Sequence, residues 1–159
     1  MRVFWIDVPD RGGLAIVSRP LGGDRLAPEI AELRAHGFDS VLSLLESEEV
    51  KELGLEAEAA TCAEHALAFH AFPIADRGLP GDKTAFETVT GLLANGIAKG
   101  GKVAVHCRAG IGRSSLAAAR ILVRLGVPGV ETLDLISRAR GLSVPDTDEQ
   151  RWWIKSLVV

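Results

Sequence analysis

Short apolar runs alternate along this chain with longer segments in which apolar residues recur at helical spacing. The short runs are bounded by glycine, proline or polar residues, which is typical of strands in the interior of a sheet. They predict strands over residues 3–6, 14–18, 40–45, 67–72 and 103–105. The first two would be joined by a turn in the Pro-Asp-Arg-Gly-Gly segment, 9–13.

The longer segments predict helices, several of them marked by a proline or a capping residue at the start and a glycine at the end. We expect helices over 28–36, 48–53 (capped by Ser47), 55–66, 84–99, 114–125, 130–140 and 150–158. The last helix would turn Trp153, Ile154, Leu157 and Val158 inward. This alternation predicts an α/β fold, a mixed and largely parallel central sheet flanked by helices on both faces, with a site at the carboxyl end of a strand.

Composition changes this picture little. The chain has 159 residues, 47% of them hydrophobic, which suits one domain over 1–159 with one substantial core. A net charge of −3 gives no general attraction to nucleic acid. No apolar stretch is long enough for a membrane span or a signal peptide, so we expect a cytoplasmic protein. Its oligomeric state is open.

The segment His-Cys-Arg-Ala-Gly-Ile-Gly-Arg-Ser-Ser, 106–115, lies between the strand at 103–105 and the helix that begins at Ser114. Backbone N–H groups at the start of a helix have no partners within the helix, and together with the helix dipole they favour an anion. Gly110 and Gly112 permit the backbone angles that point successive N–H groups into one concavity. The segment therefore predicts a phosphate site.

The side chains of this segment suggest chemistry at that phosphate. The backbone of Arg108, Ala109, Gly110, Ile111 and Gly112 would surround the anion, and the planar fork of Arg113 would close the cradle. A cysteine beside a helix N-terminus and cationic groups ionises more readily than a free thiol, so we expect Cys107 to be a thiolate at neutral pH. Ser114 could hydrogen-bond that sulfur. We expect the ring of His106, on the opposite face of the strand, to support the turn by bonding backbone nearby.

Cys-x5-Arg-Ser preceded by His resembles the signature of the cysteine-dependent protein tyrosine phosphatase superfamily. The upstream segment Phe-Pro-Ile-Ala-Asp-Arg-Gly-Leu-Pro, 72–80, resembles the mobile loop that supplies an acid in that superfamily. Its Pro-Ile-Ala-Asp sequence is most similar to the cyclin-dependent-kinase-associated phosphatase type of the dual-specificity group. Low-molecular-weight phosphatases place the acid after the cysteine, whereas Asp76 precedes Cys107.

The resemblance implies two-step hydrolysis of a phosphate monoester. Cys107 would attack phosphorus while Arg113 and the turn amides hold the phosphate oxygens, and Asp76 would protonate the leaving oxygen. Water would then hydrolyse the phosphocysteine, with Asp76 as base, Ser114 easing departure of the sulfur, and Gln150 orienting the water, as a glutamine does in several members. The reaction needs no metal or other cofactor.

Several assignments have alternatives. Asp76 could be a turn residue, and Asp82 is its nearest rival as the acid, although it suits the cap of the helix after it. Gln150 also fits a capping box with Thr147. Cys62 is expected to be a small buried residue, and a resolving disulfide with an oxidised Cys107 is a second possibility.

Other glycine-rich turns fit less well. The segment lacks the lysine of a nucleotide-binding loop, and a dinucleotide fingerprint would leave Cys107 and Arg113 without roles. We favour a dual-specificity phosphatase acting on phosphorylated proteins. Inositol-phosphate specialists carry lysines within the turn, where this chain has Arg108 and Ile111. A phosphoinositide or RNA 5′-phosphatase, or a phosphate-binding module without catalysis, are the alternatives.

Overall fold

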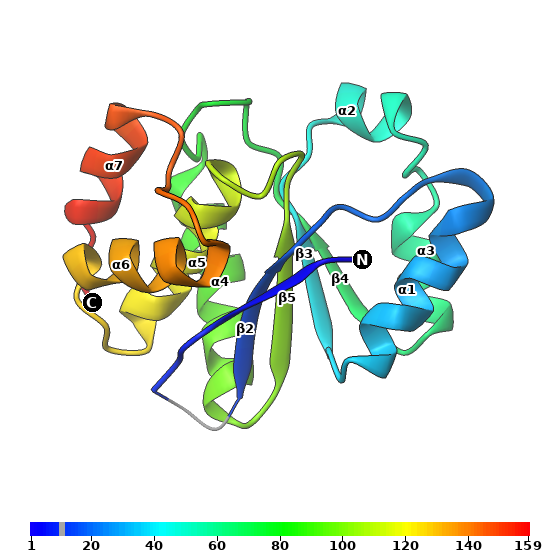
Figure 1. The fold of residues 1–159 in the computed structure, drawn as a ribbon, viewed down its shortest axis with the longest axis horizontal. Coiled ribbons are helices and arrows are strands. Elements are labelled where there is room, and N and C mark those ends of the chain that lie inside the picture. The colour runs from blue at the N-terminus through cyan, green and yellow to red at the C-terminus, as the bar shows by residue number, and fades with distance from the viewer. Residues whose placement is uncertain (10–11) are drawn as a thin grey trace.

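The protein has a central five-stranded sheet with helices on both sides (Figure 1). Its structure is a computed structural model that describes residues 1–9 and 12–159. The strands are β1 (Val3–Ile6), β2 (Gly13–Val17), β3 (Ser40–Ser43), β4 (Ala68–Ala71) and β5 (Lys102–His106), in the spatial order β1-β2-β5-β3-β4. Only β1 runs antiparallel to its neighbour. The predicted mixed, largely parallel sheet is confirmed. The predicted turn at 9–13 includes Asp10 and Arg11, which lie outside the described residues.

The helices cover the two faces unequally. They are the 3-10 turn η1 (Gly23–Arg25), α1 (Leu26–Ala35), α2 (Ser47–Glu52), α3 (Glu58–Glu64), α4 (Lys83–Ala98), α5 (Arg113–Arg124), α6 (Gly129–Arg140) and α7 (Asp148–Lys155). Figure 1 shows α4 to α7 on one side of the sheet and α1 and α3 on the other. No helix in the described residues combines the length and apolar character that crossing a bilayer requires.

Alternate residues of each inner strand enter two separate cores, because successive side chains of a strand point to opposite faces. Val103 and Val105 of β5 pack in the core beneath α4 and α5, and Ala104 packs in the core beneath α1 and α3. Burial on both faces explains why these strands appear in the sequence as uninterrupted apolar runs. It also holds the central strand rigidly beneath the segment that follows it.

The paired strands end level with one another. Ser43, the last residue of β3, is opposite Ala71, the last of β4, and His106, the last of β5. The three segments that leave these strands are therefore brought together at one edge of the sheet. They contain the Cys107 turn, the Asp76 loop and helix α2.

Some predicted details are wrong. Ser47 begins α2 rather than capping it, and the cap position belongs to Glu46, whose backbone N–H donates to the Glu49 carboxylate at 2.9 Å. The helix expected over 55–66 spans only Glu58–Glu64, and the short η1 turn was not expected. In the C-terminal segment Ile154 is buried, but Val158 is 76% exposed because α7 ends at Lys155 and the chain leaves the core.

Candidate active site

The turn from Cys107 to Gly112 joins the central strand β5 to the amino end of α5. Cys107 is buried, and the Gly110 N–H donates to its Sγ at 3.2 Å. Gly110 adopts a positive φ of 71°, which residues with a side chain rarely accept. The turn therefore bends back over the sulfur and directs at least one backbone N–H toward it. A negative charge on or beside the sulfur would be stabilised there.

Gly112 is favoured by close packing rather than by the backbone freedom that its sequence position suggested. Its backbone angles are ordinary ones, φ −84° and ψ −73°. A Cβ at this position would overlap with a carboxylate oxygen of Asp146 and lie 2.9 Å from Oε1 of Gln150. Close approach of these side chains, rather than an unusual backbone angle, accounts for the second glycine of the turn.

Arg113, the first residue of α5, is 2% exposed and forms two hydrogen bonds with one carboxylate. Its Nη1 donates to Oε2 of Glu49 at 2.7 Å and its Nη2 to Oε1 at 2.9 Å, while Nη1 also donates to the Ile74 carbonyl at 3.0 Å. Burial opposes the charge of Arg113, but the hydrogen bonds to Glu49 and the charge of Cys107 outweigh it and raise the arginine's pKa. The same bonds lower the pKa of Glu49. Sequence reasoning missed Glu49, which stands in a surface-like acidic segment.

Asp76 lies on the loop that leaves β4 and faces the same guanidinium. Its Oδ1 is 3.5 Å from Nη2 of Arg113, and its side chain is 68% exposed. A tight turn in which the Gly78 N–H donates to the Ala75 carbonyl at 2.8 Å supports the loop from within. The structure thus brings the expected acid to the exposed side of the buried arginine, where a substrate could reach it. Asp82 has a different role. Its Oδ1 caps α4 by accepting a hydrogen bond from the Ala85 N–H at 3.0 Å, as expected.

Gln150 is buried, and its amide is already engaged. Its Oε1 accepts from the Thr147 N–H at 3.3 Å and its backbone N–H donates to Thr147 Oγ1 at 3.1 Å, so the capping box is present. Its Nε2 donates to the Gly78 carbonyl at 3.0 Å. Gln150 therefore connects α7 to the loop that bears Asp76. Its role toward water remains a prediction.

His106 does not bond backbone, and that expectation is wrong. Its Nε2 lies 2.6 Å from Oε1 of Glu58, and both side chains are almost fully buried, at 0% and 2% exposure. The alternation of the strand turns the ring away from the Cys107 side and toward α3, where the carboxylate of the helix's first residue meets it. Its Nδ1 has no hydrogen-bond partner within residues 1–9 and 12–159.

The two serines after Arg113 differ. Ser115 Oγ donates to the Ile111 carbonyl and supports the turn. Ser114 Oγ is buried and has no partner in the part of the chain that the structure describes. A buried hydroxyl without a partner is costly, so such a group in a native structure calls for an explanation. The hydrogen bond from Ser114 to the Cys107 sulfur that the sequence suggested is not formed in the structure, so this role of Ser114 stays a prediction.

Arg140, the last residue of α6, holds the outer side of the turn and was not expected. Its Nε donates to the Gly110 carbonyl at 2.7 Å and its Nη2 to the Ala109 carbonyl at 3.4 Å, with the guanidinium stacked 4.0 Å from the Phe4 ring centroid. Burial and the like charge of Arg2 lower the pKa of Arg140. Its position at two successive carbonyls fixes the direction of the N–H groups on the other side of the same peptide units.

Two other predicted residues lie further from the chemistry. Arg108 is half-exposed and bonds Oε2 of Glu52 at 3.2 Å. Cys62 is fully buried in the core beneath α1 and α3, and this burial raises its pKa to about 12. Cys107 belongs to the core on the opposite face of the sheet. The two cysteines thus occupy different layers, and the second possibility for Cys62 gains no support.

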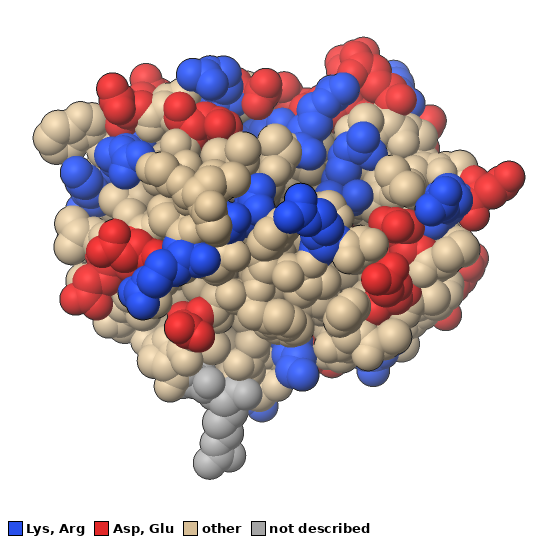
Figure 2. Space-filling model, in the orientation of Figure 1, with Lys and Arg blue, Asp and Glu red and all other residues tan. Residues whose placement is uncertain are grey.

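Basic side chains gather across the middle of the face that Figure 2 shows, over the segments that follow the carboxyl ends of the strands, with acidic side chains mostly nearer its margins. The overall charge of the chain is −3, so this is a local feature. A local positive field of this kind raises the encounter rate with anionic substrates.

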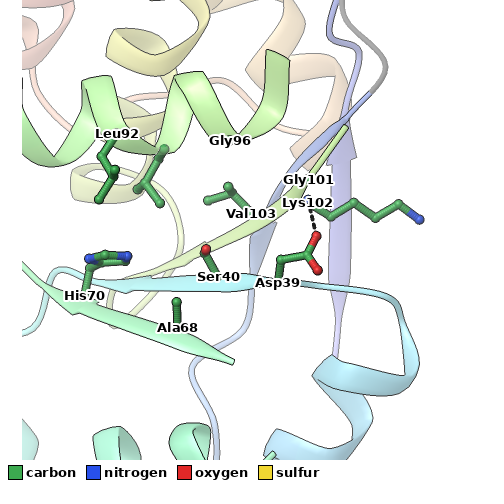
Figure 3. Close-up of a pocket in the computed structure, with 10 residues that line it drawn as sticks. Asp39, Ser40, Ala68, His70, Leu92, Gly96, Gly101, Lys102 and Val103 are labelled. Atoms are coloured by element: carbon green, nitrogen blue, oxygen red, sulfur yellow. Dashed lines mark hydrogen bonds between the residues drawn. The ribbon is translucent and has the colours of Figure 1, made fainter. Parts of the chain in front are cut away.

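A separate hollow of about 320 Å³ lies at the other end of the sheet, between α4 and strands β3, β4 and β5 (Figure 3). Leu92 and Gly96 of α4 face Ser40, Ala68 and His70 across it. Burial lowers the pKa of His70, and the Asp39 carboxylate at its rim already accepts the Lys102 N–H at 2.8 Å. This hollow contains no part of the Cys107 turn and is not part of the candidate site.

The fold and this turn define a phosphatase of the cysteine-dependent, dual-specificity class. The family model described as "polymorphic toxin system, DSP-PTPase phosphatase" matches residues 15–127, which include Asp76, the whole turn and α5. The chain belongs to this family. No curated protein sequence matches it significantly.

Solved structures agree on the fold. A kinase-associated phosphatase with its catalytic cysteine replaced by serine superposes with a TM-score of 0.87 at 20% identity, over 97% of this chain and 92% of that one. A putative protein tyrosine phosphatase from Leishmania major gives 0.79 at 20% identity, over 100% of both chains. PTPMT1 in complex with PI(5)P gives 0.74 at 18% identity, over 95% and 92%.

Proposed function

We propose that this protein hydrolyses phosphate monoesters through a phosphocysteine intermediate on Cys107, and that its substrates are proteins carrying phosphotyrosine and phosphoserine or phosphothreonine. The observation that supports this most directly is the buried Arg113, which closes the Cys107 turn and faces Asp76 at 3.5 Å. A thiol, an anion cradle and an acid thus converge where the carboxyl ends of β3, β4 and β5 meet. A site that only bound phosphate would not need the thiol or the acid.

The first step places the phosphate against the turn. The backbone N–H groups that face the sulfur bind the phosphate oxygens. Arg113 adds the N–H donors that are not already bonded to Glu49 and Ile74. A guanidinium has five N–H groups, of which Glu49 and Ile74 take three. The Nε–H and the second Nη2–H remain for phosphate. As the S–P bond forms and the P–O bond breaks, Asp76 gives its proton to the departing oxygen.

The second step returns the enzyme to its starting state. A water forms a bond to phosphorus, the P–S bond breaks, and its electron pair returns to Cys107 as a thiolate. Asp76, ionised by the first step, takes the proton of the water. Ser114 Oγ has no hydrogen-bond partner among the described residues, so its hydroxyl is free to donate to the leaving sulfur in this step. A nucleophile of this kind requires a reduced thiol, which supports our proposal that the protein acts in the cytoplasm.

Phosphoproteins are the favoured substrates because the acid-loop sequence is most similar to the kinase-associated type, and a kinase-associated phosphatase superposes over nearly the whole chain. A phosphoinositide substrate is the second candidate, supported by the similarity to PTPMT1, which was solved with PI(5)P. An RNA 5′-phosphatase activity has no specific support.

Hydrolysis of an aryl phosphate in the presence of a chelator tests the proposal. We expect turnover by the wild type and none by Cys107→Ser. Asp76→Asn should slow hydrolysis of an ester with a poor leaving group about 10²- to 10⁴-fold, the usual contribution of a general acid, and slow an ester with a good leaving group less. Asp82→Asn is the matched control, since asparagine also caps helices well.

Two outcomes would overturn the assignments. A wild-type rate no greater than that of Cys107→Ser would show that the protein is not an enzyme of this kind. An Asp76→Asn rate equal to the wild type on the ester with the poor leaving group would show that Asp76 is not the acid. A panel of phosphopeptides and phosphoinositide vesicles then compares kcat/KM between the two substrate classes.

A further inference from the structure

Residues 146–150 place two side-chain oxygens against the Cys107 turn. A Cβ on Gly112, directly before Arg113, would overlap with Oδ2 of Asp146 and lie 2.9 Å from Oε1 of Gln150. Both oxygens therefore approach the catalytic turn from the side that the glycine leaves open. Residues 146–150 thus form a wall against the turn, and Asp146 and Gln150 are the two side chains of this wall that a Cβ on Gly112 would meet.

Gln150 is poorly suited to hold a water molecule beside the phosphate. Its Nε2 is committed to the Gly78 carbonyl at 3.0 Å, and its Oε1 accepts the Thr147 N–H at 3.3 Å. Releasing either bond would detach α7 from the Asp76 loop or open the helix cap. A buried amide with these bonds keeps one lone pair and one N–H, but its position is fixed by the helix cap and by the Asp76 loop, which makes it a structural connector first.

Asp146 has the opposite properties. It is exposed to solvent, it immediately precedes the cap residue of α7, and its carboxylate has no hydrogen bond or ion pair among the described residues. An ionised carboxylate is an acceptor with several free lone pairs, which is what a water molecule held for attack requires. Gln150 and Gly78 connect the same wall to the loop of Asp76, so the two carboxylates lie on linked segments.

We propose that Asp146 is a further catalytic residue, which accepts a hydrogen bond from the water that hydrolyses the phosphocysteine. The inference rests on the proposed function. In the second step one hydrogen of the water is held by Asp146 and stays on the oxygen, while Asp76 takes the other as a proton. The oxygen forms its bond to phosphorus and the sulfur leaves with the electron pair. Gln150 acts as a positioning residue for the wall that carries Asp146.

The two steps can be separated experimentally. Rapid mixing with an aryl phosphate measures release of the phenol in the first turnover, and the steady state includes hydrolysis of the intermediate. We expect Asp146→Asn to leave the first-turnover rate within about twofold of the wild type and to lower the steady-state rate about tenfold, a modest share of what proton-transfer groups contribute. A phosphate adduct on Cys107 should then accumulate in the mass spectrum of the intact protein.

Asp148→Asn is the matched control, because Asp148 is an exposed carboxylate two positions away at the start of α7. It should leave both rates unchanged. Equal effects of Asp146→Asn on the two rates, no effect on either, or the same effect from Asp148→Asn would each overturn the role of Asp146. A wild type that forms no adduct and is no faster than Cys107→Ser would instead overturn the proposed function.

Discussion

Arg113 and Glu49, 64 positions apart in the chain, share two hydrogen bonds of 2.7 and 2.9 Å at the centre of the candidate site. The carboxylate comes from the first turn of α2, after β3, and the guanidinium from the first turn of α5, after β5. The pair fixes the plane of the guanidinium, because two parallel bonds allow only one orientation. Glu49 therefore sets the orientation in which Arg113 meets a phosphate, although Glu49 itself would not contact that phosphate.

Replacing Glu49 by glutamine should impair phosphate binding more than folding. Glutamine keeps the shape and one acceptor but loses the charge-assisted pair, which is worth about 1.5–3 kcal/mol. We expect kcat/KM for an aryl phosphate to fall about 10- to 100-fold, mainly through KM. Glu48→Gln, at an exposed neighbouring position, should have no effect. An unchanged KM in Glu49→Gln would show that Arg113 is oriented without it.

The same ion pair gives the stability of the protein a pH dependence. Arg113 lowers the pKa of Glu49 in the folded state, so the unfolded state binds more protons in acid. The stabilisation is present above the ordinary glutamate pKa of 4.5 and is lost as the pH falls through the lower folded value. Urea unfolding of the wild type and Glu49→Gln should give free energies that differ most at neutral pH and converge below pH 4.5. A difference that stays constant across this range would contradict the linkage.

Arg140→Lys should loosen the catalytic turn without removing a charge. A lysine cannot bond two successive carbonyls and stack on Phe4 at the same time, because its ammonium is compact and not planar. We expect kcat/KM to fall about tenfold, corresponding to one charge-assisted hydrogen bond. Arg138→Lys, on the same helix but exposed, is the control. The idea fails if both variants retain full activity.

The two cysteines should differ sharply in reactivity. Burial raises the pKa of Cys62 to about 12, so that thiol is protonated at neutral pH as well as inaccessible. Iodoacetamide at pH 7 should alkylate Cys107 alone, and inorganic phosphate should slow the reaction by occupying the turn. Peptide mapping of the labelled protein identifies the site. Labelling of Cys62 in the folded protein at a comparable rate would contradict this assignment.

The sequence was most informative where structure is local. The apolar run of β5, the glycines of the turn and the helix after it are neighbours in the chain, and their spacing predicted the position of Cys107 and Arg113 in an anion site. The alternation along β5 also gave the direction of the His106 ring. It did not give Glu58 as the partner, because nothing in the short helical segment that carries Glu58 distinguishes it from its exposed acidic neighbours.

Glu49 and Arg140 escaped prediction for the same physical reason. Each contacts the turn through a bond between elements far apart in sequence, and each belongs to a charged segment that resembles an ordinary solvated surface. The contact of Asp146 with Gly112 is of this kind as well, since the glycine suggested backbone freedom and the structure shows crowding. Pattern and spacing report periodicity, whereas these contacts depend on how the finished sheet brings its ends level.

That level edge has a consequence for how activity is acquired. Cys107, Asp76 and Glu49 follow three different strands, and none of them is near the other two until β3 has paired with both β4 and β5. A partly folded chain can hold a helix or a turn but not a working combination of thiol, acid and oriented arginine. Turnover should therefore report the pairing of β3 with β4 and β5, and its recovery during refolding would time that step of sheet assembly.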